Sequence, residues 1–380
     1  MGDFDVQGPG SGARRVCTTL RALIYLLILA FGVAPACAAD GVFIPAAGRI
    51  DYADDAAHHL LYIGTSAGSI LRYDTSSQAF LTPIQISGSY PMGMDLSPDG
   101  SHLLFADGNG YNATQSWFHD LNLTTGVDTP VAFTNSSANE LTTYSVAYGA
   151  DGRALVTTEF VGSGLVKLRR YDPSDGSVTV LGDIFQNAVL MPSADRSAIA
   201  IAADNISPGA FGRYRTSDGD IRFAPALNAS LNQIGVDRNA SHYAVPSGLG
   251  TLIYDQNFNL LGTIGQDGGP RPTSVVYSPN SDVLYATWLD SSLVKVFDAT
   301  SLAELRSFQT DQPFNIFNAN HRFDDGWLRT SPDGSLLFVG VDNGVRMITV
   351  PEPATGTLPL FGSVMLALRR RHGLGRRRAS

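Results

Sequence analysis

The sequence predicts an all-β domain, a seven-bladed β-propeller with four strands in each blade. Three observations support this prediction: one hairpin unit recurs along the chain, its copies are spaced by about the length of a propeller blade, and residues 40–350 contain no long amphipathic helix pattern. The chain of 380 residues divides into an N-terminal leader (1–39), this repeat domain (40–350) and a C-terminal tail (351–380).

The clearest copy of the repeating unit is residues 90–108, YPMGMDLSPDGSHLLFADG. Its centre, residues 98–100 (Pro-Asp-Gly), predicts a hairpin turn. Proline fixes φ at the first position, aspartate bonds to the nearby backbone, and glycine adopts the left-handed conformation. Segments 92–96 and 103–106 on either side are rich in β-forming residues, so we expect two antiparallel strands there.

Seven copies of this first turn, the hairpin between the first and second strands of a blade, recur along the domain. They occupy residues 54–57, 97–100, 149–152, 193–196, 237–240, 278–281 and 331–334. Their third residues are 43, 52, 44, 44, 41 and 53 positions apart, and a four-stranded blade takes about 40–45 residues. The third strand often ends in an aromatic residue followed by aspartate, as in Tyr73-Asp74 and Phe297-Asp298. The turns of blades one, four and five lack both the proline and the glycine.

The two ends of the repeat domain predict how the ring closes. The last copy stops after its third strand, at 345–350, and the first copy is preceded by a spare strand at 41–44. An open sheet edge invites aggregation, so a propeller needs its ring sealed. We therefore expect residues 42–44 to supply the outer strand of the seventh blade.

These copies resemble the YVTN-type repeats of lactonase-like seven-bladed propellers, most closely in residues 88–100 and 272–298. The resemblance covers most of 41–350 and is strongest in blades two, six and seven. It implies a metal near the ligand mouth. A β-helix and a two-sheet sandwich are the alternative folds.

The leader has the three parts of a signal peptide. Basic residues precede an apolar run at 23–33, and small residues follow at 34–39, with cleavage expected after Ala38 or Ala39. The pair Arg14-Arg15 allows a twin-arginine signal, and Cys37 allows a lipidation site, as alternatives. The apolar run is short for a membrane span.

Both cysteines, Cys17 and Cys37, lie in this leader, so we expect no disulfide, thiolate zinc site or cysteine nucleophile in the domain. Of the 26 basic residues, three lie in the leader and six in the tail, and three of the 35 acids also lie outside 40–350. The domain therefore has 17 basic and 32 acidic residues, a net charge of about −15. This charge argues against nucleic acid as a partner.

The tail combines a proline-rich start, a short apolar stretch at 358–368 and arginine clusters near its end. Its key residues are Pro351, Glu352, Pro353, Arg369, Arg370 and Arg371. This tripartite pattern resembles the PEP-CTERM sorting signal, which implies handling by an exosortase in a Gram-negative bacterium. The apolar stretch can enter a bilayer transiently while the arginines stay on the cytoplasmic side. A disordered basic tail is the alternative interpretation.

Candidate ligand groups lie on loops of the predicted mouth, formed by the loops that enter the first strand and those that join the second strand to the third. The second-to-third connections carry acids in five blades: Asp107, Glu159, Asp204, Asp290 and Asp342. If these side chains point at the axis, they form a ring of oxygen ligands suited to Ca²⁺. The alternative is that they serve hairpin turns.

The loop that enters blade seven mixes basic, acidic and aromatic residues and is the best single candidate for a ligand loop. Its charged residues are His321, Arg322, Asp324 and Asp325. The other histidines of the domain, among them His119, are scattered over different strands and turns. His59, His102 and His242 share one position next to the first turn, at the blade edge, which favours surface roles for these three. No Gly-x-Ser-x-Gly elbow, phosphate loop or HExxH motif is present, so no catalytic residue is predicted.

The sequence thus favours an exported, exosortase-sorted and non-catalytic binding protein of the cell surface or extracellular matrix. Its expected partners are the secretion machinery, an exosortase-type enzyme, and a polysaccharide or matrix component. The alternative is a Ca²⁺-dependent, lactonase-like hydrolase that uses the acidic ring. A third hypothesis is a structural spacer in an extracellular polymer.

Overall fold

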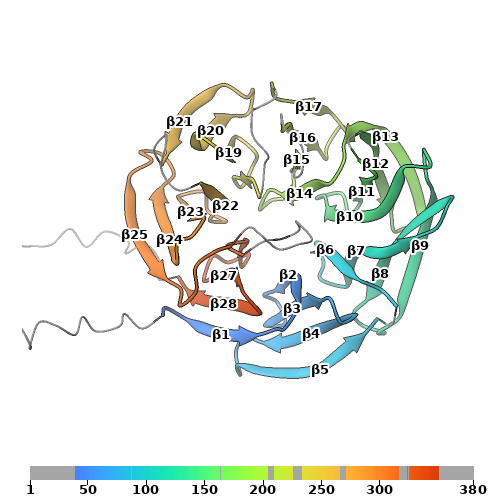
Figure 1. Cartoon of the computed structure of the whole chain (residues 1–380), viewed down its shortest axis with the longest axis horizontal. Coiled ribbons are helices and arrows are strands. Elements are labelled where there is room, and N and C mark those ends of the chain that lie inside the picture. Colours follow the sequence, from blue (N-terminus) through green and yellow to red (C-terminus); the bar gives the residue numbers. More distant parts are fainter. Residues whose placement is uncertain are drawn as a thin grey trace, which may run out of the picture. The chain divides into compact units, whose positions relative to one another are not determined.

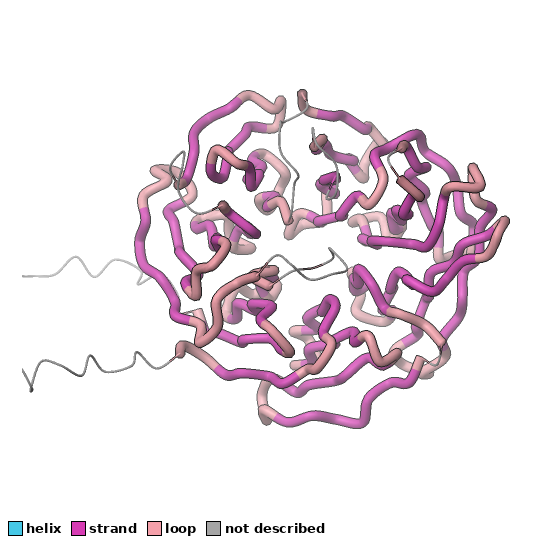
Figure 2. Tube along the Cα trace, in the orientation of Figure 1, coloured by secondary structure: helices cyan, strands magenta, loops and turns pink. Residues whose placement is uncertain are grey.

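The computed structural model describes residues 39–350 apart from 87, 163, 204–208, 226–232, 266–270, 316–322 and 324. The predicted sorting residues of the tail lie outside this range. The described chain is all-β, and its strands form seven four-stranded antiparallel sheets, the blades of a β-propeller (Figure 1). Figure 2 shows only strands and loops among the described residues, so no described helix is long and apolar enough to cross a membrane.

The first four blades follow the chain, each with its strands in sequence order. Blade one contains β2 (Arg49–Asp55), β3 (Leu60–Thr65), β4 (Ser69–Asp74) and β5 (Ala79–Gln85). Blade two contains β6 (Pro91–Leu96), β7 (His102–Tyr111), β8 (Gln115–Asn122) and β9 (Asp128–Thr134). Blade three contains β10 (Glu140–Tyr148), β11 (Ala154–Phe160), β12 (Leu165–Asp172) and β13 (Ser177–Phe185). Blade four contains β14 (Ala188–Pro192), β15 (Ala198–Ala203), β16 (Phe211–Arg215) and β17 (Ile221–Phe223).

Two further blades repeat this order, and the seventh combines both ends of the domain. Blade five contains β18 (Gly235–Val236), β19 (His242–Ser247), β20 (Gly250–Asp255) and β21 (Leu260–Ile264). Blade six contains β22 (Pro272–Tyr277), β23 (Val283–Trp288), β24 (Leu293–Asp298) and β25 (Glu304–Gln309). Blade seven contains β26 (Leu328–Thr330), β27 (Leu336–Val341), β28 (Gly344–Thr349) and β1 (Val42–Pro45).

The predicted closure of the ring is confirmed. Strand β1 pairs antiparallel with β28 in the register Val42 to Met347 through Pro45 to Gly344. Asp40, just before β1, also exchanges hydrogen bonds with Gln309 at the end of blade six. The N-terminal strand therefore joins the last blade to its neighbour as well as completing it.

The first turns share one geometry in six blades. The fourth turn residue donates its N–H to the carbonyl of the first and has a positive φ; these residues are Gly100, Gly152, Arg196, Ala240, Ser281 and Gly334. Blade one differs: Asp55 pairs with Leu60, so its turn lies one residue later than the predicted 54–57, and His59 has the positive φ. The turns of blades four and five also lack proline and glycine and keep the predicted position, whereas in blade one the adjacent Asp54 and Asp55 are both suitable first turn residues, so the local sequence left the register open.

The predicted aromatic-aspartate pairs do end third strands, and the aspartates close the following turns. Asp74 Oδ1 accepts the N–H of Ser76 and of Ser77, both at 2.9 Å. Asp298 Oδ1 likewise accepts the N–H of Ser301 at 2.6 Å. Much of the aspartate content of this domain therefore serves turn structure.

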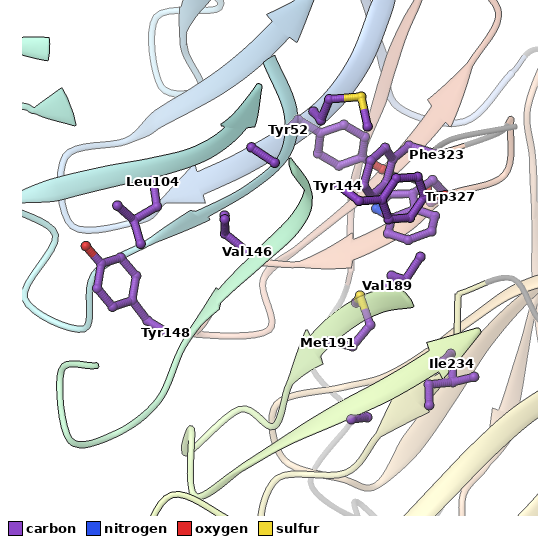
Figure 3. Packing of buried hydrophobic residues seen from close by; sticks show 14 of the residues in the cluster. Tyr52, Leu104, Tyr144, Val146, Tyr148, Val189, Met191, Ile234, Phe323 and Trp327 are labelled. Atoms are coloured by element: carbon purple, nitrogen blue, oxygen red, sulfur yellow. Dashed lines mark hydrogen bonds between the residues drawn. The ribbon is translucent and has the colours of Figure 1, made fainter. Parts of the chain in front are cut away.

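The main hydrophobic core draws residues from every blade except blade six, whose buried side chains form separate clusters with blades five and seven, and it includes an aromatic cluster near the axis. Figure 3 shows Tyr144, Phe323 and Trp327 packed together, with Tyr52 beside them. The ring centroid of Phe323 lies 6.2 Å from that of Tyr144 and 4.7 Å from that of Trp327. Tyr52 Oη donates to the carbonyl of Trp327 at 2.6 Å. We call these four residues the aromatic plug.

A glycine on β6 makes room for this plug. A Cβ at Gly93 would come within 2.8 Å of Ser145 Cα and 3.1 Å of Phe323 Cζ. Any larger residue would therefore push blades two and three apart or displace the ring. The inner strands thus pack tightly at this level of the axis.

Candidate functional site

The predicted acidic ring does not form one cluster in the described part of the chain. Glu159 accepts a hydrogen bond from Thr142 Oγ1 at 2.7 Å, whereas Asp290 and Asp342 are exposed on their connections. Asp204 lies outside the described residues. Within those residues, no three His, Cys, Asp or Glu side chains are placed to hold a metal ion, and a calcium site involving Asp204 stays a prediction.

The predicted ligand loop is described only in part. His321, Arg322 and Asp324 lie outside the described residues. Asp325 accepts a hydrogen bond from Arg49 Nη2 at 3.2 Å. Burial raises the pKa of Asp325, although the charge of Arg49 opposes this shift.

Asp107, the fifth predicted acid, belongs to a buried histidine cluster in blade two. His119 Nε2 lies 3.2 Å from Asp107 Oδ2 and 3.1 Å from Ser89 Oγ. Its Nδ1 lies 2.9 Å from Asp128 Oδ2. Asp107 Oδ1 also accepts the N–H of Tyr90 at 2.7 Å. We call His119, Asp107, Asp128 and Ser89 the histidine cluster.

The serine, histidine and aspartate of this cluster have the connectivity of a nucleophilic triad, but the charge state is wrong for a general base. Burial alone lowers the pKa of His119, yet the hydrogen bonds and charges of Asp107 and Asp128 outweigh burial and raise it to about 9. The imidazole is therefore protonated near neutral pH and donates from both nitrogens. It also stacks on Phe105, with ring centroids 4.7 Å apart. His119 therefore forms ion pairs with two aspartates, and these contacts connect β7, β8 and β9.

A cavity of about 660 Å³ opens around the axis at the face formed by the first turns. It is lined by the ends of inner strands and by first turns of six blades, and we call it the axial pocket. Its charged lining residues are Asp54, Asp55, Asp95, Asp99, Asp195, Arg196 and Arg329. This is the face opposite the predicted mouth, because first turns and second-to-third connections lie at opposite ends of the strands.

One buried carboxylate of the pocket ties three blades together. Asp95, on β6, accepts from Arg196 Nη1 at 2.7 Å and from Arg196 Nη2 at 2.9 Å, a two-pronged ion pair. It also accepts the N–H of Tyr148, on β10, at 2.7 Å. Arg196 reaches this position because the first turn of blade four places it at φ 57°. The pair therefore holds the pocket wall in one arrangement.

A second carboxylate makes the equivalent connection between blades one, two and seven. Asp51 Oδ2 accepts from Arg329 Nη2 at 2.8 Å and from the N–H of Met94 at 2.8 Å. Asp51 is fully buried, and burial raises its pKa against the opposing charge of Arg329. The two guanidinium groups of the pocket are thus each neutralised by an aspartate.

Asp54 differs from the other acids that line the cavity, Asp55, Asp95, Asp99 and Asp195. Its Oδ2 is buried and has no hydrogen-bond partner among the described residues. Burial, followed by the charges of Asp333 and Asp55, raises the pKa of Asp54 to about 7. A carboxylate with this pKa changes charge near neutrality and is free to take a partner.

The aromatic plug lies toward the start of the inner strands, and the pocket lies at their ends. Tyr144 belongs to β10, which ends at Tyr148 beside the pocket, and Trp327 directly precedes β26, whose Leu328 lines the pocket. Gln233 adds a polar clamp, donating from Nε2 to the carbonyl of Leu328 at 2.5 Å and accepting its N–H at 2.7 Å. The pocket is therefore backed by packed side chains.

Sequence reasoning missed Asp51, Asp54, Asp95, Arg196 and Arg329 as site residues, because it searched loops for acids. One pattern could have located two of them. Asp95 and Arg329 each stand two residues before the first residue of a first turn, a position where a charge is out of place in a buried inner strand. No protein-family model matches the chain, and no curated protein is significantly similar to it.

Proposed function

We propose that this chain is an exported β-propeller that binds a ligand at the surface or in the extracellular matrix of a Gram-negative bacterium, without catalysis of its own. The observation that carries the proposal is the axial pocket, whose ion pairs are locked between blades. A cavity of about 660 Å³ has the size of a small-molecule or side-chain binding site.

The chemistry of the described clusters supports binding over catalysis. In the histidine cluster, Asp107 and Asp128 hold His119 in its protonated form, so the imidazole cannot accept a proton near neutral pH. In the pocket, Asp95 and Arg196 are engaged with each other and with the backbone of Tyr148. Groups held in this way fix a shape and a charge pattern.

The fold supports the proposed export and sorting. Removal of residues 1–39 would leave β1 intact, because the strand starts at Val42. Removal of residues 351–380 would leave β28 intact, and the N–H of Val350 donates to the carbonyl of Ser335 within the propeller. Both predicted processing segments can therefore be cut away without the loss of a strand.

The test is cell fractionation of the epitope-tagged full chain in a Gram-negative host that has an exosortase. We expect a product shortened at both ends at the cell surface or in the medium. A variant with Pro351→Ala, Glu352→Ala and Pro353→Ala should remain with the inner membrane, whereas Asp74→Asn should behave like the parent. A full-length parent protein in the cytoplasm would refute export, and equal sorting of parent and triple variant would refute the role of the tail.

The alternative proposal is a Ca²⁺-dependent hydrolase that uses the acidic ring. A calcium titration of the melting temperature tests it, with EDTA reversal and Asp204→Asn as the variant. At 100 times the dissociation constant, bound metal should add about 2.7 kcal/mol, a rise of roughly 5 °C for a domain of this size. A reversible rise that is lost in the variant would favour the hydrolase, and no rise would remove the metal site from consideration.

A further inference from the structure

The axial pocket has an uncompensated negative charge. Arg196 neutralises Asp95, and Arg329 neutralises Asp51, so both guanidinium groups are already used. Four acids of the lining remain: Asp54, Asp55, Asp99 and Asp195. Their summed field favours a cation inside the pocket and disfavours an anion.

Three of these acids already have partners. Asp55 Oδ2 lies 2.8 Å from His58 Nδ1. Asp99 and Asp195 close first turns, and each accepts a serine hydroxyl, at 2.6 Å for Asp99 and at 2.8 Å for Asp195. Asp54 alone among the four has a buried oxygen without a hydrogen-bond partner in the described chain. It is the carboxylate to which a bound cation would connect.

A second unpartnered polar group belongs to a residue of the pocket lining. Tyr277, at the end of β22, is 4 % exposed, and its hydroxyl has no hydrogen-bond partner among the described residues. Buried polar groups are normally hydrogen-bonded, and an unsatisfied one marks a place for a missing partner. The phenol can accept a hydrogen bond from an N–H donor.

Most of the remaining lining is apolar, apart from Ser97, Ser193 and Thr330. Met191, Val236, Val276 and Leu328 form its inner part, and Pro98, Pro279 and Pro332 stand at the rim. Such a surface suits a hydrocarbon chain. Among the described residues, the acids of the pocket are not grouped so that three of them could hold a metal ion. The negative charge and the apolar wall together specify an organic cation.

We propose that the axial pocket binds an aliphatic amine, with its ammonium group on Asp54 and its hydrocarbon chain along the apolar wall. The proposal rests on the proposed function, because it names the ligand class of a binding protein. The carboxylates of Asp99 and Asp195 at the rim would attract a second ammonium group, so diamines should bind more tightly than monoamines.

The experiment is isothermal titration calorimetry of the purified full chain at pH 8 with three probes of equal length. 1,6-Diaminohexane is the cationic probe, 1,6-hexanediol the neutral one and adipate the anionic one. We expect one saturable site for the diamine and no saturable binding of the diol or of adipate. Saturable binding of adipate, or equal binding of diamine and diol, would overturn the proposal.

Asp54→Asn is the test variant because it keeps the shape of the side chain and removes its charge. We expect it to weaken diamine binding at least tenfold. Asp74→Asn, at an exposed turn of the same blade, is the matched control and should leave the affinity unchanged. Equal affinities of the two variants would overturn the assignment to Asp54.

The result is independent of the fractionation test. Diamine binding lost in Asp54→Asn, together with a cytoplasmic protein, would refute export and keep the pocket. A surface protein without diamine binding would keep export and refute the ligand class.

Discussion

The histidine cluster and the axial pocket both contain buried carboxylate oxygens, but only in the histidine cluster do these oxygens have hydrogen-bond partners throughout. In the histidine cluster, both ring nitrogens of His119 have carboxylate partners, and Asp107 Oδ1 is bound by backbone N–H groups. In the pocket, Asp54 keeps a buried oxygen without a partner in the described chain and borders an open cavity. The first arrangement is complete in itself, whereas the second lacks one component.

The difference teaches how to separate structural charge from functional charge. Burial and strongly shifted pKa values occur in both groups, so neither property alone identifies a site. What distinguishes them is whether each polar atom has a partner and whether space remains beside it. Four experiments test this distinction, starting with the one of largest expected effect.

Asp95→Ala should break the locked half of the pocket. It leaves the partly buried guanidinium of Arg196 and the buried N–H of Tyr148 without their carboxylate partner, so we expect a loss of about 3–5 kcal/mol in the free energy of unfolding. Urea denaturation measures this loss. The control is Asp151→Ala, which removes an exposed pair with Arg153 and should cost less than about 1 kcal/mol. Equal losses would mean that Asp95 is not a cross-blade connection.

His119→Gln should remove a pH dependence from the stability of the protein. The pKa of His119 is about 9 in the folded chain against 6.5 for the free side chain, so the folded state binds the proton more tightly. This stabilisation is fully present below pH 6.5 and is lost as pH rises through about 9. The free energy of unfolding of the parent should fall by about 3 kcal/mol over this range.

The measurement is urea denaturation at several pH values between pH 6.5 and 9. The profile of His119→Gln should be flatter by that amount. His58→Gln alters an exposed histidine and should keep the parental slope. A parental slope in His119→Gln would contradict the charged state assigned to the cluster.

Asp54→Asn should raise the free energy of unfolding, whereas Asp95→Ala should lower it. The pKa of Asp54 is raised from 3.8 to about 7, so the folded chain is favoured below pH 3.8 and loses that contribution as pH rises through 7. At pH 8 the ionised carboxylate has no partner, and we expect the variant to be more stable than the parent by on the order of 1–3 kcal/mol. Thermal melts at pH 4 and pH 8 should show the gain only at the higher pH. A loss of stability at pH 8 would show that Asp54 is already paired.

Ala240→Gly and Arg196→Gly change the same position, the fourth residue of a first turn, in two blades. Arg196 lines the axial pocket, whereas Ala240 is not among its lining residues. Both residues have φ 57°, a conformation that costs a residue with a Cβ about 1–2 kcal/mol. Glycine at 240 should gain about 0.5–1 kcal/mol, because the entropy of the unfolded chain cancels part of the relief. Glycine at 196 should lose stability, because Asp95 then lacks its cation. A gain in both variants, measured by urea denaturation, would show that the guanidinium contributes nothing.

The sequence predicted the fold well because the signals of the fold are local. Four of the seven first turns contain proline or glycine within four residues, and the seventh blade lacked the one strand that residues 42–44 supply. The turn of blade one was displaced by one residue because Asp54 and Asp55 are both suitable first turn residues. Blade existence was thus easier to predict than turn register.

The axial pocket could not be predicted in the same way. Asp95 and Arg196 are 101 residues apart, and Asp51 and Arg329 are 278 apart, so only the closed ring brings them together. The acids that sequence reasoning chose sit in short turns, where aspartate has a local structural use. Asp107 shows this, because its side chain binds the backbone N–H of Asn109 two residues away.

Closure of the ring by β1 also determines when in synthesis the last blade can form. The strand Val42–Pro45 is made first, and its partner Gly344–Thr349 is made last. At ribosomal speeds of about 5–20 residues per second, β1 waits roughly 15–60 s for β28. During that interval the ring cannot close, so the nascent chain is an open series of blades. Pairing of β1 with β28 is therefore the last strand pairing that synthesis allows.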